Sequence, residues 1–123
     1  MTKDEALAFA HQWIAAWNSR DIEAILAHYE DGVELVSPVA AQLLGLPGGL
    51  VSGKAALRDY FARGLAAFPQ LRFQLVDTLA GMDSIVLYYL NQRGTHTAEF
   101  MQLAPTGPAV KVRRVLAHYS VAS

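Results

Sequence analysis

Residues 9–38, FAHQWIAAWNSRDIEAILAHYEDGVELVSP, decide the fold of this chain. The pattern predicts two amphipathic helices that are separated by a short polar break and followed by a strand. Asp21 is a residue type that caps a helix N-terminus, and from Ile22 onward apolar residues repeat at the spacing of one helix face. We predict a short strand over 33–36 that ends before Pro38, because proline cannot donate to a strand ladder.

The sequence on either side of this segment predicts two further helix boundaries. Thr2 and Glu5 have the spacing of a capping box, which begins the first helix. Residues 53–68, GKAALRDYFARGLAAF, predict a third helix with Ser52 as its cap, and Pro69 ends it.

Residues 39–52, VAAQLLGLPGGLVS, are apolar, yet they contain glycines and a proline that disfavour a stable helix. Two interpretations stay open. The segment is either a lid over something apolar, such as a cavity or an interface, or a β-hairpin that turns at Pro47-Gly48 and packs on the core. Long loops of this kind are often functional.

From Leu71 onward the hydrophobic period changes from about 3.6 to about 2, which is typical of strands. Turn residues at 81–84, 93–94 and 105–108 divide this half of the chain. The four predicted strands lie near 71–80, 84–92, 95–104 and 109–121, most simply as an antiparallel meander. Helices first and strands second predict an α+β fold, with the helices on one face of a curved sheet. We expect residues 1–123 to form one domain.

The composition limits the classes of partner. Hydrophobic residues make up 53% of the chain and charged residues 17%, against about 25% charged in average domains, which predicts an apolar cavity, a buried subunit interface, or both. The absence of cysteine excludes disulfides and thiolate chemistry. A net charge of −1 gives no reason to expect nucleic acid or a membrane as a partner. The acidic N-terminal residues do not fit a secretion signal, and we expect a cytoplasmic protein.

The strand pattern places Glu99 on an apolar face of the sheet. If Arg93-Gly94 is a two-residue hairpin loop, Tyr88 lies opposite Glu99, and Met101 shares this face. The other face also carries large apolar groups, among them Leu87, Tyr89 and Phe100. We therefore expect a homodimer that forms through the outer face of the sheet.

Glu99 is the main candidate for chemistry, because a carboxylate on an apolar strand face is paired, protonated or functional. Desolvation raises a carboxyl pKa toward neutral pH, which suits a general acid or base. Two alternatives stay open: a solvated glutamate at the strand rim, or one that is bonded to the Tyr88 hydroxyl. His118 is the second candidate, although strand alternation does not decide which face it occupies.

Trp13 and Trp17 are four residues apart on one helix face. They either fill the core or form the flat wall of a pocket for a ring-shaped ligand. The sequence contains no nucleophile motif, phosphate loop, dinucleotide fingerprint or metal-ligand spacing.

Three groups of residues carry a resemblance to a known family: Trp17-Asn18-x-x-Asp21-Ile22-Glu23-Ala24-Ile25 with Tyr29, then Val33-x-x-x-x-Pro38, then Gly53-Lys54-Ala55-Ala56-Leu57-Arg58-x-Tyr60-Phe61. Over nearly its whole length the chain resembles the nuclear-transport-factor-2-like superfamily, whose members form a cone of three helices and a curved sheet. SnoaL-like polyketide cyclases, ketosteroid isomerases and limonene epoxide hydrolases belong to this superfamily, so the resemblance implies the fold more firmly than the activity.

The comparison with ketosteroid isomerases is made residue by residue. The position of their general base is Ser37 here, and the position of their oxyanion-hole tyrosine is Trp13. The two supporting tyrosines fall on Tyr29 and Phe61. Their protonated acid on the long strand falls on Glu99, so one carboxyl group of the expected set remains. A steroid-isomerase mechanism is not expected.

The resemblance implies an apolar pocket in which Glu99 is the main ionisable group and Ser37 is a polar contact at one end. The expected substrate-binding residues are Trp13, Trp17, Tyr29, Ser37, Phe61, Tyr88, Met101 and His118. The leading hypothesis is a SnoaL-like enzyme that uses Glu99 as the acid/base on a small apolar or cyclic molecule, without a cofactor. The alternatives are a non-catalytic ligand-binding module and a dimeric association domain whose cone is filled by its own side chains.

Overall fold

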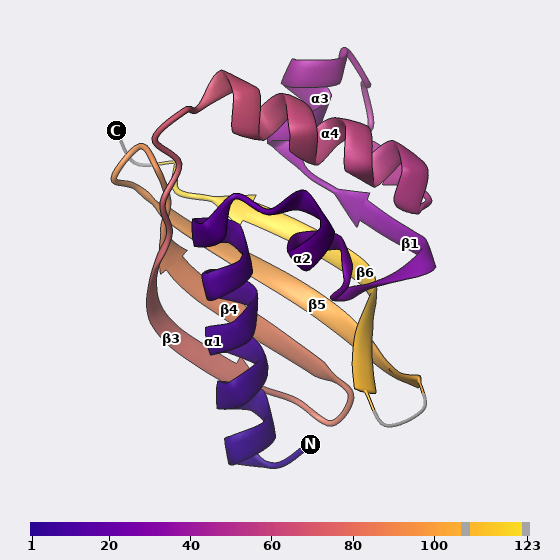
Figure 1. The fold of residues 1–123 in the computed structure, drawn as a ribbon, viewed down its shortest axis with the longest axis vertical. Coiled ribbons are helices and arrows are strands. Elements are labelled where there is room, and N and C mark those ends of the chain that lie inside the picture. Colours follow the sequence, from indigo (N-terminus) through magenta and orange to yellow (C-terminus); the bar gives the residue numbers. More distant parts are fainter. Residues whose placement is uncertain (107–108, 122–123) are drawn as a thin grey trace.

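A curved six-stranded sheet with helices on one face forms the fold (Figure 1). The computed structural model describes residues 1–106 and 109–121, so the turn predicted at 105–108 lies partly outside the described residues. The helices are α1 (Lys3–Ser19), α2 (Ile22–Leu26), α3 (Pro38–Leu44) and α4 (Lys54–Ala67). The strands are β1 (Tyr29–Val36), β2 (Leu50–Ser52), β3 (Gln74–Ala80), β4 (Ser84–Leu90), β5 (His96–Thr106) and β6 (Ala109–Tyr119). None of the described helices is long and apolar enough to cross a bilayer.

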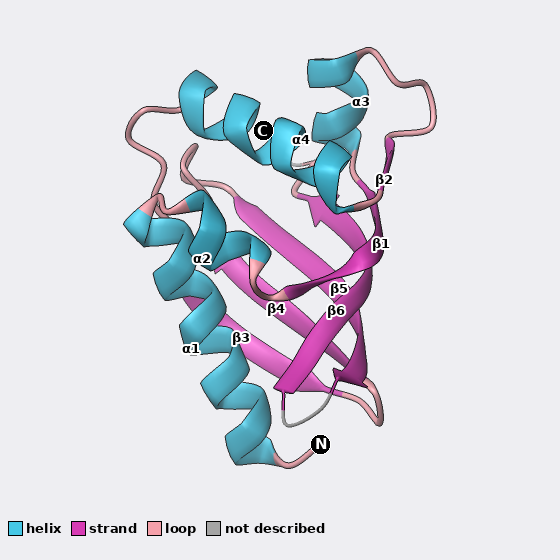
Figure 2. Cartoon of the chain, turned by 45° about the vertical axis from the view of Figure 1, so that its right-hand side comes forward, coloured by secondary structure: helices cyan, strands magenta, loops and turns pink. Residues whose placement is uncertain are grey.

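The strands follow the order β2-β1-β6-β5-β4-β3. The α+β class and the antiparallel meander of β3 to β6 are confirmed. The pairing of β1 with β6 is parallel, with Val36 opposite Leu116, and a parallel pair needs a long crossover. As a result Ser37, which follows β1, lies beside the end of β6. Figure 2 shows α1, α2 and α4 on one side of the strands.

Two of the three predicted helix starts are confirmed. Thr2 and Glu5 form the capping box of α1, and the Asp21 side chain accepts hydrogen bonds from two backbone N–H groups of α2. The third is wrong, because Ser52 is the last residue of β2. Gly53 stands at the N-terminus of α4 with a φ of 87° and no side-chain cap, a backbone region that glycine enters without steric cost.

The segment after β1 contains a fourth helix, which corrects the expectation that glycine and proline would exclude one. Pro38 stands in the first turn of α3, where its missing N–H needs no partner. The Ser37 hydroxyl caps this helix, and Gly45 ends it with a φ of 67°. The chain then returns as β2, antiparallel to β1. The proline and glycine therefore delimit a short helix, and neither the lid nor the tight hairpin describes the segment alone.

The hairpin between β4 and β5 differs by one residue from the predicted register. Leu90 pairs with His96, so the loop holds five residues, 91–95, where two were predicted. The Asn91 side chain fixes this loop, because its Oδ1 accepts from the backbone N–H of Arg93 at 2.9 Å. A one-residue shift moves every side chain of a strand to the opposite face. On β4, the residues that face the helices are therefore Ile85, Leu87 and Tyr89.

Asn18 and Arg20, in the polar break at the end of α1, form hydrogen bonds with α4 and with the residue before β3. Arg20 donates hydrogen bonds to the carbonyl oxygens of Leu65 and Phe68, at 2.7 and 3.0 Å, near the end of α4. Asn18 donates to the Phe73 carbonyl oxygen at 2.9 Å and accepts from its N–H at 2.8 Å. These contacts fix the C-terminal end of α4 and the residue that precedes β3.

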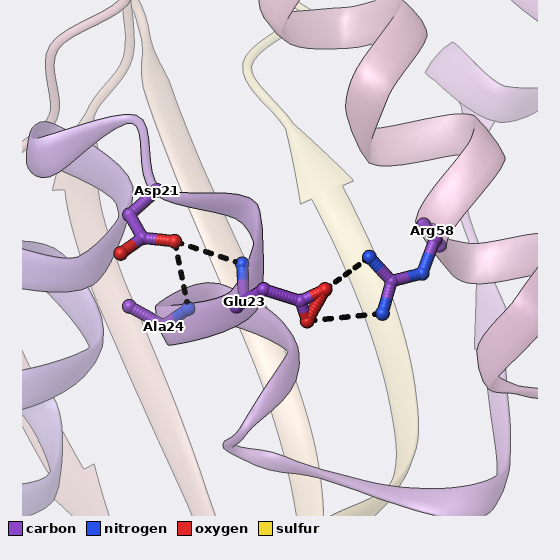
Figure 3. Close-up of polar contacts among 4 residues, drawn as sticks. All are labelled: Asp21, Glu23, Ala24 and Arg58. Carbon is purple, nitrogen blue, oxygen red and sulfur yellow. Dashed lines mark hydrogen bonds and ion pairs between the residues drawn. The ribbon is translucent and has the colours of Figure 1, made fainter.

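A second connection joins α2 to α4 on the surface, where Glu23 forms an ion pair with both terminal nitrogens of Arg58 (Figure 3). Both side chains are largely exposed, and exposed ion pairs contribute about 0 to 1 kcal/mol.

We expect Arg20→Gln to lower the free energy of unfolding by about 1 to 3 kcal/mol, because charged hydrogen bonds to part-buried carbonyl groups are lost. Arg58→Gln, the matched control, should lower it by less than about 1 kcal/mol. Urea denaturation of both variants measures the difference. Equal losses would contradict the role given to Arg20.

Candidate functional site

A cavity of about 470 Å³ lies between the helices and the inner face of the sheet. Its apolar lining includes Trp17, Leu35, Phe61, Phe68, Leu71 and Phe73. Its polar lining includes Ser37, Tyr60, Tyr89, Asn91, Thr97 and Tyr119. The helix α3 also contributes Val39, Gln42 and Leu43. An apolar cavity with a few converging polar groups is the usual form of a small-molecule site.

Glu99 lies on the inner face of β5, between Leu87 of β4 and Ala117 of β6. Only 7% of the residue is exposed. Burial raises the pKa of its carboxyl group from 4.5 to about 7, and a hydrogen bond from the Tyr89 hydroxyl to Oε2 works in the opposite direction. Among the described residues, Oε1 has no hydrogen-bond partner. Glu99 can therefore hold or release a proton near neutral pH.

The hydroxyl-bearing residues Ser37, Tyr60 and Tyr119 line the same cavity. Burial, reinforced by the charge of Glu99, raises the pKa of both tyrosines above the usual value. The Ser37 hydroxyl partly lowers both pKa values. The two phenols therefore stay protonated at neutral pH, so they can donate hydrogen bonds to a ligand oxygen.

The structure brings together four of the predicted site residues: Trp17, Ser37, Phe61 and Glu99 line the cavity. The Trp17 indole nitrogen is buried and has no hydrogen-bond partner within the described part of the chain. Ser37 also stabilises the fold, because its hydroxyl oxygen caps the N-terminus of α3.

Three predicted residues belong to the core behind the cavity. Trp13, Tyr29 and Met101 are almost fully buried, and none of them is part of the lining. The Trp13 indole N–H donates to the Tyr29 hydroxyl oxygen at 2.9 Å. Of the two interpretations of the tryptophan pair, Trp13 fits the core and Trp17 fits the pocket wall.

Two predicted residues lie on the outer face, so their placement in the pocket was wrong. Tyr88 pairs with Ala98 and stacks on the His96 ring, with ring centres 5.0 Å apart. His118 also pairs with Ala98 and is exposed. Of the two alternatives left open for Glu99, neither describes it: it is buried, and the hydroxyl that bonds it belongs to Tyr89, not to Tyr88.

The sequence prediction missed three tyrosines of the site, Tyr60, Tyr89 and Tyr119. A signal for Tyr89 was present, since asparagine side chains often bond the backbone two residues ahead in a turn. A predicted loop that begins at Asn91 gives the register between the two strands that places Tyr89 on the inner face. No local signal marks Tyr119, because its face depends on how β6 pairs with β5.

Within residues 1–106 and 109–121, no group of three or more histidine, aspartate or glutamate side chains could hold an ion.

The family resemblance is confirmed by comparison with known proteins. A family model described as the SnoaL-like domain matches residues 10–123. The chain is 39% identical to a SnoaL-like protein of unknown function from Burkholderia thailandensis, whose crystal structure has a TM-score of 0.89 over 97% of each chain. No curated protein matches the chain.

Two other crystal structures share the fold at lower identity. A proposed isomerase of the SnoaL-like family from Agrobacterium tumefaciens has a TM-score of 0.73 at 16% identity, over 95% of this chain and 98% of that one. AclR, a proposed hydroxylase from Streptomyces galilaeus, has a TM-score of 0.71 at 19% identity, over 97% and 91%.

The raised pKa of Glu99 makes stability depend on pH. Above pH 4.5 the unfolded chain releases this proton, whereas the folded chain keeps it until about pH 7. The contribution of Glu99 to the free energy of unfolding is therefore fully present at low pH. It falls by about 3 kcal/mol as the pH rises from 4.5 to about 7.

We expect Glu99→Gln to remove this part of the pH dependence of the free energy of unfolding. The control Glu34→Gln changes an exposed carboxylate of β1 and should retain the fall, because Glu99 is still present. Urea denaturation at a series of pH values gives the difference between each variant and the wild type. An unchanged slope in Glu99→Gln would contradict the assignment.

Proposed function

The chain belongs to the SnoaL-like domain family, and we propose that it is an enzyme that moves a proton on a small, largely apolar, cyclic molecule. Glu99 is the acid/base, and no cofactor takes part in the step. One observation carries the proposal: a buried carboxyl group with a pKa of about 7 lines an apolar cavity of about 470 Å³.

The two oxygens of Glu99 have different surroundings. Tyr89 donates to Oε2 and orients the carboxyl group, and Oε1 has no partner among the described residues. We assign Oε1 as the oxygen that removes a proton from the substrate. A pKa near the working pH populates both protonation states, which is the best condition for general acid–base catalysis.

Tyr60 and Tyr119 supply hydrogen bonds to the substrate oxygen. When the Glu99 carboxylate removes a proton from a carbon beside a carbonyl group, the electron pair moves to the carbonyl oxygen. A tyrosine hydroxyl then donates to this oxyanion, and Glu99 returns its proton to another carbon. Isomerisation and cyclisation share this step, to which one acid/base group contributes about 10²- to 10⁴-fold.

A non-catalytic binding module is the second candidate. In that case Glu99 only orients a ligand through a hydrogen bond, and the Trp17 side chain supplies part of the binding surface. The two candidates differ in whether Glu99 can accept a proton from carbon.

The probe 5-nitrobenzisoxazole tests that ability without knowledge of the natural substrate. A base removes its ring C–H proton, the N–O bond breaks, and the product is a coloured cyanophenolate. We expect the rate to rise with a midpoint near pH 7 as Glu99 ionises. Glu99→Gln should reduce the rate by at least about 100-fold, whereas Glu34→Gln should not.

Quenching of tryptophan fluorescence by the probe measures binding in the same variants, because Trp17 lines the cavity. Binding that persists in Glu99→Gln without turnover supports the enzyme. A wild-type rate that Glu99→Gln leaves unchanged would refute it, and binding without any turnover in the wild type favours the binding module.

We also propose that the outer face of the sheet binds a second copy of the chain. A row of five paired apolar residues crosses five strands on this face: Leu79, Val86, Phe100, Leu116 and Val36. Leu79 is 53% exposed. A two-fold axis along the strands would place one copy of the row on the other.

The next row supports a second copy rather than another partner. It begins at Asp77 on β3 and ends at His118 on β6. The same two-fold axis brings Asp77 of each copy toward the β6 side of the other, where its carboxylate can accept a hydrogen bond from the His118 ring at both ends of the interface.

Phe100→Asp should convert the dimer to a monomer, because it buries a charge in the centre of the interface. Leu79→Asp, at a more exposed position that is easier to accommodate in the fold, should do the same. Leu7→Glu, on the exposed side of α1, should leave the dimer intact. Sedimentation velocity over a range of concentrations measures these states. A monomeric wild type would contradict the proposal.

A further inference from the structure

Two charged residues line the cavity in the described part of the chain, Glu99 and Arg93. They have different surroundings. Glu99 is buried on the inner face of β5, whereas Arg93 is exposed in the loop between β4 and β5. A ligand that fills the cavity would therefore meet a carboxyl group at its inner end and a guanidinium group at its outer end.

The loop holds Arg93 in a fixed position. Asn91 Oδ1 accepts from the backbone N–H groups of Arg93 and Thr95, at 2.9 and 3.3 Å, and Asn91 Nδ2 donates to Thr97 Oγ1 at 2.8 Å. The same asparagine that sets the register of the hairpin therefore places Arg93. A loop built this way presents its side chain with little further loss of conformational entropy on binding.

The Arg93 side chain is also oriented by an aromatic ring. Its guanidinium carbon lies 5.3 Å from the centre of the Phe68 ring, at the end of α4. Within the described residues, this guanidinium group has no ion pair and no hydrogen bond. Arg93 nevertheless belongs to the lining of the cavity, together with Phe68 and Tyr119.

From this arrangement we infer that the substrate is a small cyclic carboxylic acid. Its carboxylate binds Arg93 at the cavity mouth, its ring lies along Phe68 and Trp17, and its reacting carbon reaches Glu99. The inference rests on the proposed function and specifies its substrate class.

The charges favour a carboxylate over a more highly charged group. Arginine presents a planar fork of donors that matches a carboxylate or a phosphate. A single arginine offsets one negative charge, so a phosphate monoester, with about two charges at neutral pH, would leave an unpaired charge beside an apolar cavity. A neutral ring compound would leave the guanidinium group unused.

A matched pair of ligands tests the inference. The compounds 2-naphthoate and 2-naphthamide have nearly the same shape and differ in charge. Isothermal titration calorimetry at pH 6, where most of Glu99 is protonated, measures both affinities. We expect wild-type protein to bind 2-naphthoate about tenfold more tightly than 2-naphthamide.

Variants of the two arginines locate the source of this preference. In Arg93→Gln we expect the two compounds to bind equally, and in Arg93→Lys we expect an intermediate preference, because the charge remains and the fork is lost. Arg72→Gln, at an exposed arginine outside the cavity, should keep the full preference. Added salt should reduce the preference, since the pair lies at an exposed mouth.

Equal binding of the two compounds by the wild type would overturn the inference, as would a preference that survives in Arg93→Gln, or no binding of either compound. The same titration with Glu99→Gln separates this inference from the proposed function. The preference for 2-naphthoate should persist there, because it depends on Arg93 alone. Loss of benzisoxazole turnover therefore bears on Glu99, and loss of charge preference bears on Arg93.

Discussion

The register between β4 and β5 is the constraint on which the site depends, and the Asn91 side chain sets it. By accepting from two N–H groups of its own loop, Asn91 makes the connection five residues long and pairs Leu87 with Glu99. Tyr89 then shares the inner face with Glu99 and donates to its carboxyl group. A shift of one residue would turn Tyr89 to the outer face and Tyr88 to the inner face, so the hydrogen bond from Tyr89 to the carboxyl group would be lost.

Glu99 is buried because hydrogen bonds hold the helices in place against the inner face of the sheet. Asn18 and Arg20, at the end of α1, hold the backbone of Phe73 and the last turn of α4, whose side chains wall the cavity. This wall buries the carboxyl group, so desolvation outweighs the Tyr89 hydrogen bond and raises its pKa. The contacts that hold the helices against the sheet therefore also contribute to the raised pKa of Glu99.

The alternation of side chains along each strand gives the two faces of the sheet different compositions. Along β5, Glu99 and Met101 point toward the helices, and Phe100, which lies between them, points outward. The inner row combines polar and apolar groups around a cavity, whereas the outer row of Phe100 is apolar across five strands. Substitutions on one face therefore leave the side chains of the other face unchanged.

Local patterns in the sequence determined the elements. The capping box at Thr2, the N-cap at Asp21 and the change of period near Leu71 each depend on neighbours within a few residues. Glu99 and Met101 were placed on one face correctly, because positions two apart on one strand share a face whatever the partner strand does.

Only the tertiary structure decided which elements meet. The parallel pairing of β1 with β6 brings Ser37 beside Tyr119, although 82 residues separate them in the sequence. The α3 helix has local boundaries in Pro38 and Gly45, but its place beside the cavity depends on the pairing of β1 with β2 and β6. The site therefore depends on long-range closure and hairpin register, which a hydrophobic period does not encode, since shifting a strand by one residue preserves the period and reverses the faces.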